Sequence, residues 1–225
     1  MQSNPACPHC SNRSVKNGKH NAKQRFLCST CSKTFYTQYS YKAYHPQTNY
    51  YISSYIKESC GIRSIARLLK ISTTTILSRI LKIAAQITKP KLTLYKNYEL
   101  DEMCTYIQKK TRLRWIVYAI RSDTKEVVDF CVGRRTNKVL NQVIQTLLLS
   151  QATKVSTDKL PAYRYLIPES VHSTQFRSTN HIERKNLSLR THLKRLTRRT
   201  ICYSKSASLL TACLRIYFWS SLSSI

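Results

Sequence analysis

The sequence predicts an α/β domain preceded by two smaller modules. Three observations lead to this expectation: paired cysteines near the N-terminus, apolar residues at helical spacing from Asn49 to about Ile87, and strands alternating with helices from about Leu92 onward. The length of 225 residues suits one domain of about 130 to 150 residues with one or two small modules. We therefore divide the chain into residues 1–40, 41–90 and 91–225.

The chain is strongly basic, with 38 Lys and Arg against 10 Asp and Glu and a formal net charge of +28. Such an excess repels itself in a compact state and is tolerated where a polyanion neutralises it, so a nucleic acid is the expected partner. A hydrophobic content of 42% with 15 tyrosines argues against a disordered basic tail. The sequence has neither a run of about 18 apolar residues nor a secretory signal pattern, so we expect a protein inside the cell that does not contact a membrane.

The first chemical motif is a pair of CxxC sequences. Cys7-Pro-His-Cys10 is followed, after 17 residues, by Cys28-Ser-Thr-Cys31. Two such knuckles can direct four thiolates at one tetrahedral Zn²⁺, and residues 24–27 are typical of a strand leading into the second knuckle. The motif predicts a structural zinc ribbon over residues 1–40. The alternatives are four free cysteines or a site in which His9 or His20 replaces a sulfur. The ribbon would have a basic face, because Lys16, Lys19, Lys23 and Arg25 lie between the knuckles without an acid.

The segment from Gly61 to Leu77 resembles a helix-turn-helix within residues 41–90. Its first helix has an apolar stripe, a break follows near Ile71, and Ser72 can cap the second helix. Lys70 stands where many such motifs have a turn glycine, so a plain helical hairpin is the alternative. Residues 1–98 contain 16 basic side chains and one acid, which favours DNA binding. The side chains that we expect to face DNA are Arg63, Arg67, Thr73, Thr74, Thr75 and Arg79.

Residues 91–225 have the pattern of an α/β domain. Strands are expected over about 97–108, 114–121 and 126–133, followed by a helix with the apolar face Leu140, Val143, Ile144, Leu147 and Leu148. A short strand over 154–157, a helix opened by Pro161 and a long helix from about Asn180 follow. This is the element order of the ribonuclease H-like fold, which we therefore assign to residues 91–225.

Acidic residues are scarce, so their positions are informative. Ten occur among 225 residues, where ordinary usage of roughly 12% would give more than twice as many. In a ribonuclease H-like fold, carboxylates on the first strand, at the end of the fourth and on the last helix meet, and here these would be Asp101, Asp158 and Glu183. Such a cluster is stabilised by two Mg²⁺ or Mn²⁺ ions, and the alternative is that all three are ordinary surface acids. Glu102 would point to the opposite face of the strand. It would take the role of Asp101 only if the even-numbered residues of this strand, and not the odd-numbered ones, faced the site.

The stretch His181-Ile-Glu-Arg-Lys-Asn-Leu-Ser-Leu-Arg190 resembles the C-terminal signature of transposases of the insertion sequence one family. The blocks ELDE at 99–102, GRRT at 133–136 and STDKLPAY at 156–163 are similar to that family's blocks in order, and so are the cysteine ribbon and helix-turn-helix. The resemblance implies a DDE transposase that binds terminal inverted repeats of double-stranded DNA. It would then cleave the strands and transfer them to a target duplex, with Asp101, Asp158 and Glu183 as catalytic residues.

The same resemblance bears on the basic residues and on the biological setting. Arg190 lies seven residues after Glu183, on the same helix face, and occupies the basic position of such helices. Nine Lys and Arg over residues 177–205 predict a phosphate track that includes Arg184, Lys185, Arg190 and Lys194. Gln175-Phe-Arg177 departs from a Gly-Lys pair expected in relatives. We expect a homo-oligomer on DNA in the cytoplasm of a bacterium or archaeon, associated with the nucleoid. The rivals are a non-enzymatic DNA-binding regulator and an RNA-binding structural protein.

Overall fold

The computed structural model describes residues 4–38, 41–175 and 178–220. The chain forms two compact units, Met1–Tyr44 and His45–Ile225. We expected a second boundary near residue 90, but the helical segment belongs to the same unit as the α/β domain. The reason is that helices α1 (Thr48–Lys57) and α3 (Thr73–Gln86) pack against the C-terminal helix α7 (Ala207–Trp219). In the described part of the chain, no helix is both long and apolar enough to cross a membrane.

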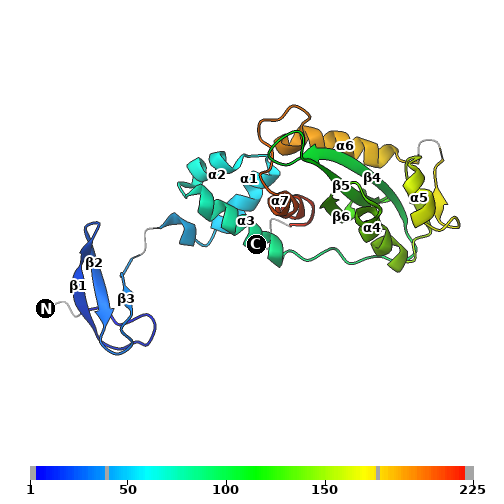
Figure 1. Cartoon of the computed structure of the whole chain (residues 1–225). Coiled ribbons are helices and arrows are strands. Elements are labelled where there is room, and N and C mark those ends of the chain that lie inside the picture. The colour runs from blue at the N-terminus through cyan, green and yellow to red at the C-terminus, as the bar shows by residue number, and fades with distance from the viewer. Residues whose placement is uncertain (1–3, 39–40, 176–177, 221–225) are drawn as a thin grey trace. The chain divides into compact units, whose positions relative to one another are not determined.

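The N-terminal unit is a small antiparallel sheet in the order β1 (Ser14–His20), β2 (Lys23–Cys28), β3 (Thr34–Phe35), followed by the 3-10 turn η1 (Lys42–Tyr44) (Figure 1). The two residues between β1 and β2 both have positive φ, as a tight hairpin requires. The apolar core consists of Phe26 stacked on Phe35 at 5.8 Å between ring centroids, together with buried Cys7 and Cys28. An apolar core this small requires an additional cross-link for stability.

The helical segment comprises α1, α2 (Ile62–Leu69) and α3. The predicted cap is confirmed: Ser72 Oγ accepts a hydrogen bond from the backbone N–H of Thr75 at 3.1 Å. Lys70 ends α2 in the left-handed conformation, with φ of 54°, which is the conformation that a turn glycine would adopt more readily. The apolar faces of α1 and α3 are buried, as Ile52, Ile56, Ile76 and Ile80 show.

The α/β domain is built on one five-stranded sheet with the order β6-β5-β4-β7-β8, of which β4, β5 and β6 are labelled in Figure 1. Strands β4 (Asn97–Tyr106), β5 (Leu113–Arg121) and β6 (Val127–Gly133) are antiparallel. Helix α4 (Asn137–Leu149) leads to β7 (Lys154–Ser156), which is parallel to β4, and α5 (Pro161–Leu166) leads to β8 (His172–Ser173). Helix α6 (Asn180–His192), the turn η2 (Lys194–Leu196) and α7 complete the chain. The expected element order is present, with β8 as an addition.

Two hydrophobic cores lie on opposite faces of this sheet. One joins Tyr98 and Leu100 of β4 to α4 and α5, and includes the predicted apolar face of α4. The other joins Met103 of β4 to Ile182 and Leu189 of α6 and to α7. Because alternate residues of a strand point to opposite faces, Glu102 belongs to the α4/α5 face and Asp101 to the α6/α7 face.

Candidate functional site

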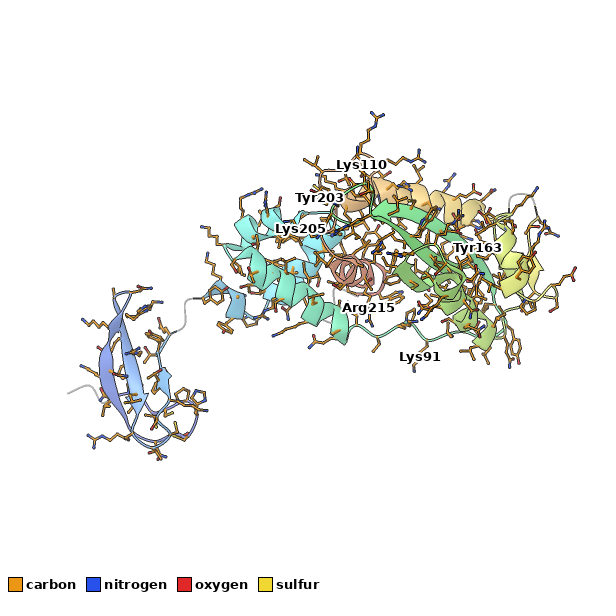
Figure 2. The ribbon with its side chains drawn as sticks, in the orientation of Figure 1. Lys91, Lys110, Tyr163, Tyr203, Lys205 and Arg215 are labelled. Carbon is orange, nitrogen blue, oxygen red and sulfur yellow. The ribbon has the colours of Figure 1, made fainter. Side chains whose placement is uncertain are left out.

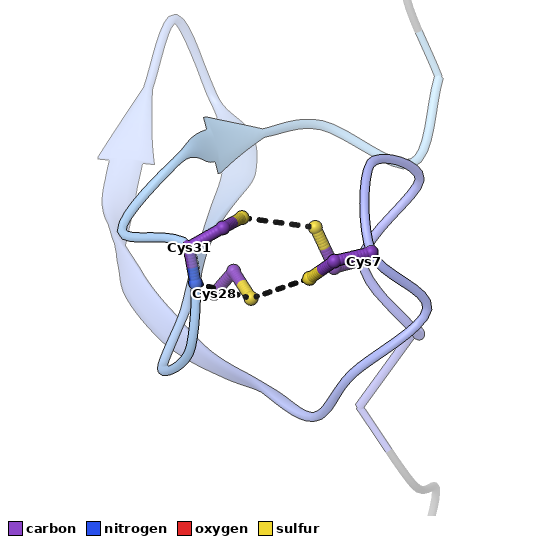
Figure 3. A group of neighbouring side chains, drawn as sticks. Cys7, Cys28 and Cys31 are labelled. Carbon is purple, nitrogen blue, oxygen red and sulfur yellow. Dashed lines mark hydrogen bonds between the residues drawn. The ribbon is translucent and has the colours of Figure 1, made fainter.

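Four cysteines of the N-terminal unit converge. The sulfur atoms of Cys7, Cys10, Cys28 and Cys31 all lie within 4.8 Å of one another, with Cys7 and Cys31 at 3.7 Å and Cys10 and Cys28 at 3.4 Å (Figure 3). The backbone N–H of Cys31 donates to Cys28 Sγ at 3.4 Å and lowers the pKa of that thiol to about 6. The thiolate is the form that binds metal, so this donor set suits a structural Zn²⁺. Neither His9 nor His20 belongs to the group among residues 4–38.

In the α/β domain, β4 and the loop after β7 bring three carboxylates together. Asp101, Glu102 and Asp158 each offer an oxygen within 4.8 Å of the others. The parallel register places Glu99 of β4 beside Ser156 of β7, so the loop that follows β7 reaches the side of Asp101. Asp158 is exposed and accepts a hydrogen bond from the backbone N–H of Leu160 at 3.0 Å. Such a group of hard oxygen donors suits Mg²⁺ or Mn²⁺.

Asp101 is held by a short chain of side chains. Its Oδ2 accepts a hydrogen bond from Asn186 Nδ2 of α6 at 2.6 Å, and Asn186 Oδ1 accepts one from the hydroxyl of Tyr118 at 2.8 Å. Burial raises the pKa of Asp101 to about 6, with the nearby carboxylates of Glu102 and Asp158 adding to the rise. A bound cation would reverse this shift, since it favours the charged carboxylate.

Glu183 is outside this group of carboxylates. It lies exposed on the first turn of α6 and accepts a hydrogen bond from the hydroxyl of Thr179 at 2.8 Å. The α6 face that packs on the sheet carries Ile182, Asn186 and Leu189, and each residue of a helix is rotated by about 100° from the one before it. The α6 side chain that contacts Asp101 is therefore Asn186, and the structure brings together two of the three expected acids.

Glu99 holds the start of α6, and sequence reasoning assigned it no role. The N-cap residue Thr179 makes no side-chain cap hydrogen bond. Glu99, only 2% exposed, instead accepts hydrogen bonds from the backbone N–H groups of His181 at 3.1 Å and Ile182 at 3.0 Å, and pairs with His181 Nδ1 at 2.6 Å. The available signal was a second acid two residues from Asp101, on the same strand face, in a chain with few acids.

Glu102 has different partners from Asp101, as its position on the opposite face requires. Its Oε1 accepts a hydrogen bond from Arg135 Nε at 2.9 Å and forms an ion pair with Arg135 Nη2 at 2.8 Å. Its Oε2 accepts a hydrogen bond from the hydroxyl of Tyr163 on α5 (labelled in Figure 2). The carboxylate is therefore already neutralised by a cation of the protein. Asp101 and Asp158 have no such ion pair within the described ranges.

The basic residues expected to bind phosphates differ in their exposure and in their hydrogen bonds. Arg184 and Lys194 are exposed and Lys185 is half-buried. Arg190 is half-buried and donates to the backbone carbonyls of Leu196 at 3.1 Å and Cys104 at 3.4 Å. The loop whose sequence departs from relatives lies partly outside the described residues, since Phe176 and Arg177 are not among them.

In the helical segment, Arg63 and Arg67 on α2 and Thr73 and Thr74 on α3 are exposed, so they are available to contact a ligand. Thr75 is half-buried beside Ser72. We expected Arg79 to face DNA, but it is half-buried and its Nη1 donates to Asn49 Oδ1 of α1 at 3.1 Å. The reason is that its neighbours Ile76 and Ile80 turn this side of α3 toward the core. An exposed stripe of α3 carries Thr74, Ser78, Leu81 and Lys82, of which sequence reasoning had singled out only the first.

Comparison with known proteins identifies relatives of the α/β domain. A family model described as IS1 transposase matches residues 96–219. Insertion element iso-IS1n protein InsB of Shigella dysenteriae is 34% identical over 111 residues, which are 49% of this chain and 85% of the relative. Insertion element IS1 protein InsB of Shigella sonnei is 38% identical over the same shares of the two chains.

Solved structures are less similar. The simian T-cell lymphotropic virus intasome in complex with a PP2A regulatory subunit gives a TM-score of 0.40 at 17% identity, covering 73% of this chain and 66% of that one. The HTLV-2 integrase catalytic core domain in complex with magnesium gives 0.37 at 15% identity, covering 57% and 86%.

Proposed function

Because the chain belongs to the IS1 transposase family and is a DNA transposase, we propose that it cleaves DNA strands at the terminal inverted repeats of its element and joins them to target DNA. The observation that carries this proposal is the convergence of Asp101 and Asp158 at the end of β7. Two unpaired carboxylates at one point repel each other, and they are tolerated where divalent cations bind. The chain as a whole has a net charge of +28 and is therefore suited to bind a polyanion.

We propose Asp101 and Asp158 as ligands of Mg²⁺ or Mn²⁺ and Glu183 as the third acid of the set. Glu183 is one helical turn from Asn186, which contacts Asp101, so a change of its side-chain rotamer or a small movement of the first turn of α6 would bring its carboxylate toward the group. When bound, two divalent ions supply charge stabilisation for the attacking and the leaving oxygen of a phosphodiester. Asn186 and Tyr118 orient Asp101, while the exposed position of Asp158 leaves room for the DNA strand.

DNA recognition would fall to the helical segment and to the surface around α6. We propose that the four-cysteine ribbon binds a structural Zn²⁺, and that α2 and α3 read the terminal repeat as a helix-turn-helix. Basic residues on and just after α6, some exposed and some half-buried, would bind phosphates near the acids. Assembly of two ends requires more than one copy of the chain, so a homo-oligomer on DNA is the expected active form. The residues proposed to contact DNA from these surfaces are Arg63, Arg67, Thr73, Thr74, Arg184, Lys185, Arg190 and Lys194.

The test is a cleavage assay on a DNA fragment that carries the ends of the element. Asp101→Asn, Asp158→Asn and Glu183→Gln should each lower cleavage by about 100-fold or more, since the metal contribution is several kcal/mol. DNA binding should persist or rise, because removing an acid leaves the positive field unopposed.

Glu126→Gln, an exposed acid with 75% side-chain exposure, is the matched control and should cleave normally. Normal cleavage by all three variants would refute the proposed acids. A wild-type chain that binds the ends but never cleaves them with Mg²⁺ or Mn²⁺ would favour the regulator.

A further inference from the structure

We propose that Arg135 binds a phosphate of the DNA strand next to the acidic group, and that Glu102 and Trp115 hold its guanidinium for this purpose. The inference rests on the proposed strand cleavage and assigns one further phosphate contact in that site. Arg135 lies in the turn between β6 and α4. Its partner Glu102 offers an oxygen within 4.8 Å of Asp101 and Asp158, so the guanidinium borders the group of carboxylates.

The close approach of α4 to the sheet explains why Arg135 lies there. Gly133, the last residue of β6, pairs in register with Trp115 of β5. A Cβ atom at Gly133 would lie 2.6 Å from Val139 Cγ2, so only glycine allows the first turn of α4 to pack this closely. The turn that carries Arg135 is thereby placed over the Trp115 end of β5.

The guanidinium is fixed from two sides. Nε and Nη2 both contact Oε1 of Glu102, at 2.9 and 2.8 Å, and Cζ lies 4.4 Å from the centroid of the Trp115 ring. Glu102 has 1% side-chain exposure and is itself held by the hydroxyl of Tyr163. An arginine held by an ion pair and an aromatic ring has already lost most of its conformational freedom, so it can bind a ligand at little further entropic cost.

One edge of this fixed guanidinium remains available. The Arg135 side chain is 41% exposed, and Nη1 is the guanidinium nitrogen with neither a hydrogen bond nor an ion pair in the described part of the chain. A planar cation with a free N–H edge suits the non-bridging oxygens of a phosphodiester. If Arg135 served only to neutralise Glu102, its exposed N–H edge would have no role.

A second guanidinium borders the same stretch of β4 from the other face. Strand β4 extends beyond β7, which pairs only with residues 97–99 of it, so residues 100–106 have no strand on that side among the described elements. Arg190 contacts the carbonyl of Cys104 there. Arg135 lies over Trp115, the cross-strand partner of Cys104. The two arginines thus approach the Cys104 end of β4 from opposite faces of the sheet, as expected for a DNA strand that passes this end of β4.

The experiment combines Arg135→Ala with DNA in which one phosphate at a time, around the cleavage position, is replaced by a neutral methylphosphonate. At one position the neutral linkage should weaken wild-type binding about 10- to 100-fold, as expected for a hydrogen bond to a charged group, and should cost Arg135→Ala nothing further. In Arg135→Ala, the slope of log binding constant against log salt concentration should decrease by about one, which corresponds to the loss of one phosphate contact. Arg135→Lys should not restore the loss, since lysine lacks the planar fork.

Two controls keep the result interpretable. Lys89→Ala removes a comparable cation, 54% exposed and paired with the buried Asp129 of β6, and should bind every modified DNA as the wild type does. Arg135→Ala could fail to fold because it leaves Glu102 unpaired. In that case the double variant Glu102→Gln/Arg135→Gln, which removes both charges, is used in the same binding experiment in place of Arg135→Ala.

Equal losses for wild type and variant at every phosphate would overturn the inference and leave Arg135 as a structural partner of Glu102. A wild type that binds with this pattern but does not cleave would refute the proposed function alone. A wild type that does not bind the element ends would overturn both.

Discussion

Replacing Glu99 with alanine should loosen the start of α6. The carboxylate accepts the backbone N–H groups of His181 and Ile182, which lie in the first turn of the helix and have no partner within it. Ile182 is fully buried, so water cannot readily replace the lost acceptor there, whereas the half-exposed His181 can be rehydrated. Losing a cap costs about 0.5 to 2 kcal/mol, and an unsatisfied buried donor costs about 1 to 3 kcal/mol.

These contributions together predict that Glu99→Ala lowers the free energy of unfolding by about 1.5 to 5 kcal/mol. For a unit of this size, that loss corresponds to a fall in melting temperature of about 3 to 20 °C. Glu99→Gln keeps one carbonyl acceptor and should cost about half as much. Cleavage should fall as well, because α6 carries Asn186 and the proposed ligand Glu183.

The measurements are urea unfolding followed by circular dichroism and hydrogen exchange of the two amides. The amide of Ile182 should be protected in the wild type and exchange rapidly in Glu99→Ala. Glu126→Ala, at an exposed acid, should stay within about 0.5 kcal/mol of the wild type. Unchanged stability and unchanged protection in Glu99→Ala would show that α6 does not depend on this carboxylate.

Three further predictions concern the N-terminal half of the chain. Purified protein should contain one zinc ion per chain, and Cys28→Ser should lose it, as measured by metal analysis; fresh protein without zinc would contradict this. Arg67→Ala should weaken binding to element ends and reduce its salt dependence without a change in melting temperature, whereas Arg79→Ala should also lower the melting temperature because its guanidinium joins α3 to Asn49. Lys70→Gly should raise the free energy of unfolding by about 1 kcal/mol, since glycine adopts φ of 54° without strain; a loss of stability would refute this.

Features that depend on neighbours along the chain could be predicted from the sequence. The strand leading into the second cysteine knuckle, the Ser72 cap and the apolar face of α4 are all present. The opposite faces of Asp101 and Glu102 also follow from the two-residue period of a strand alone. These features need only local backbone geometry, which residue type and spacing determine.

Contacts between distant elements were decided by the tertiary structure. The sequence pattern predicts that Glu183 lies on the long helix α6, but not which side of α6 faces the sheet. Burial of Ile182 and Leu189 sets that orientation, and Asn186 therefore contacts Asp101. The same is true of two other contacts. Glu99 of β4 binds the start of α6 at His181, 82 residues away, and Arg135 binds Glu102, 33 residues away. Spacing determines the face of an element on which a side chain lies. Which residue it meets depends on how two elements pack, because that packing is governed by the apolar area of the whole domain and not by the polar residues that it brings together.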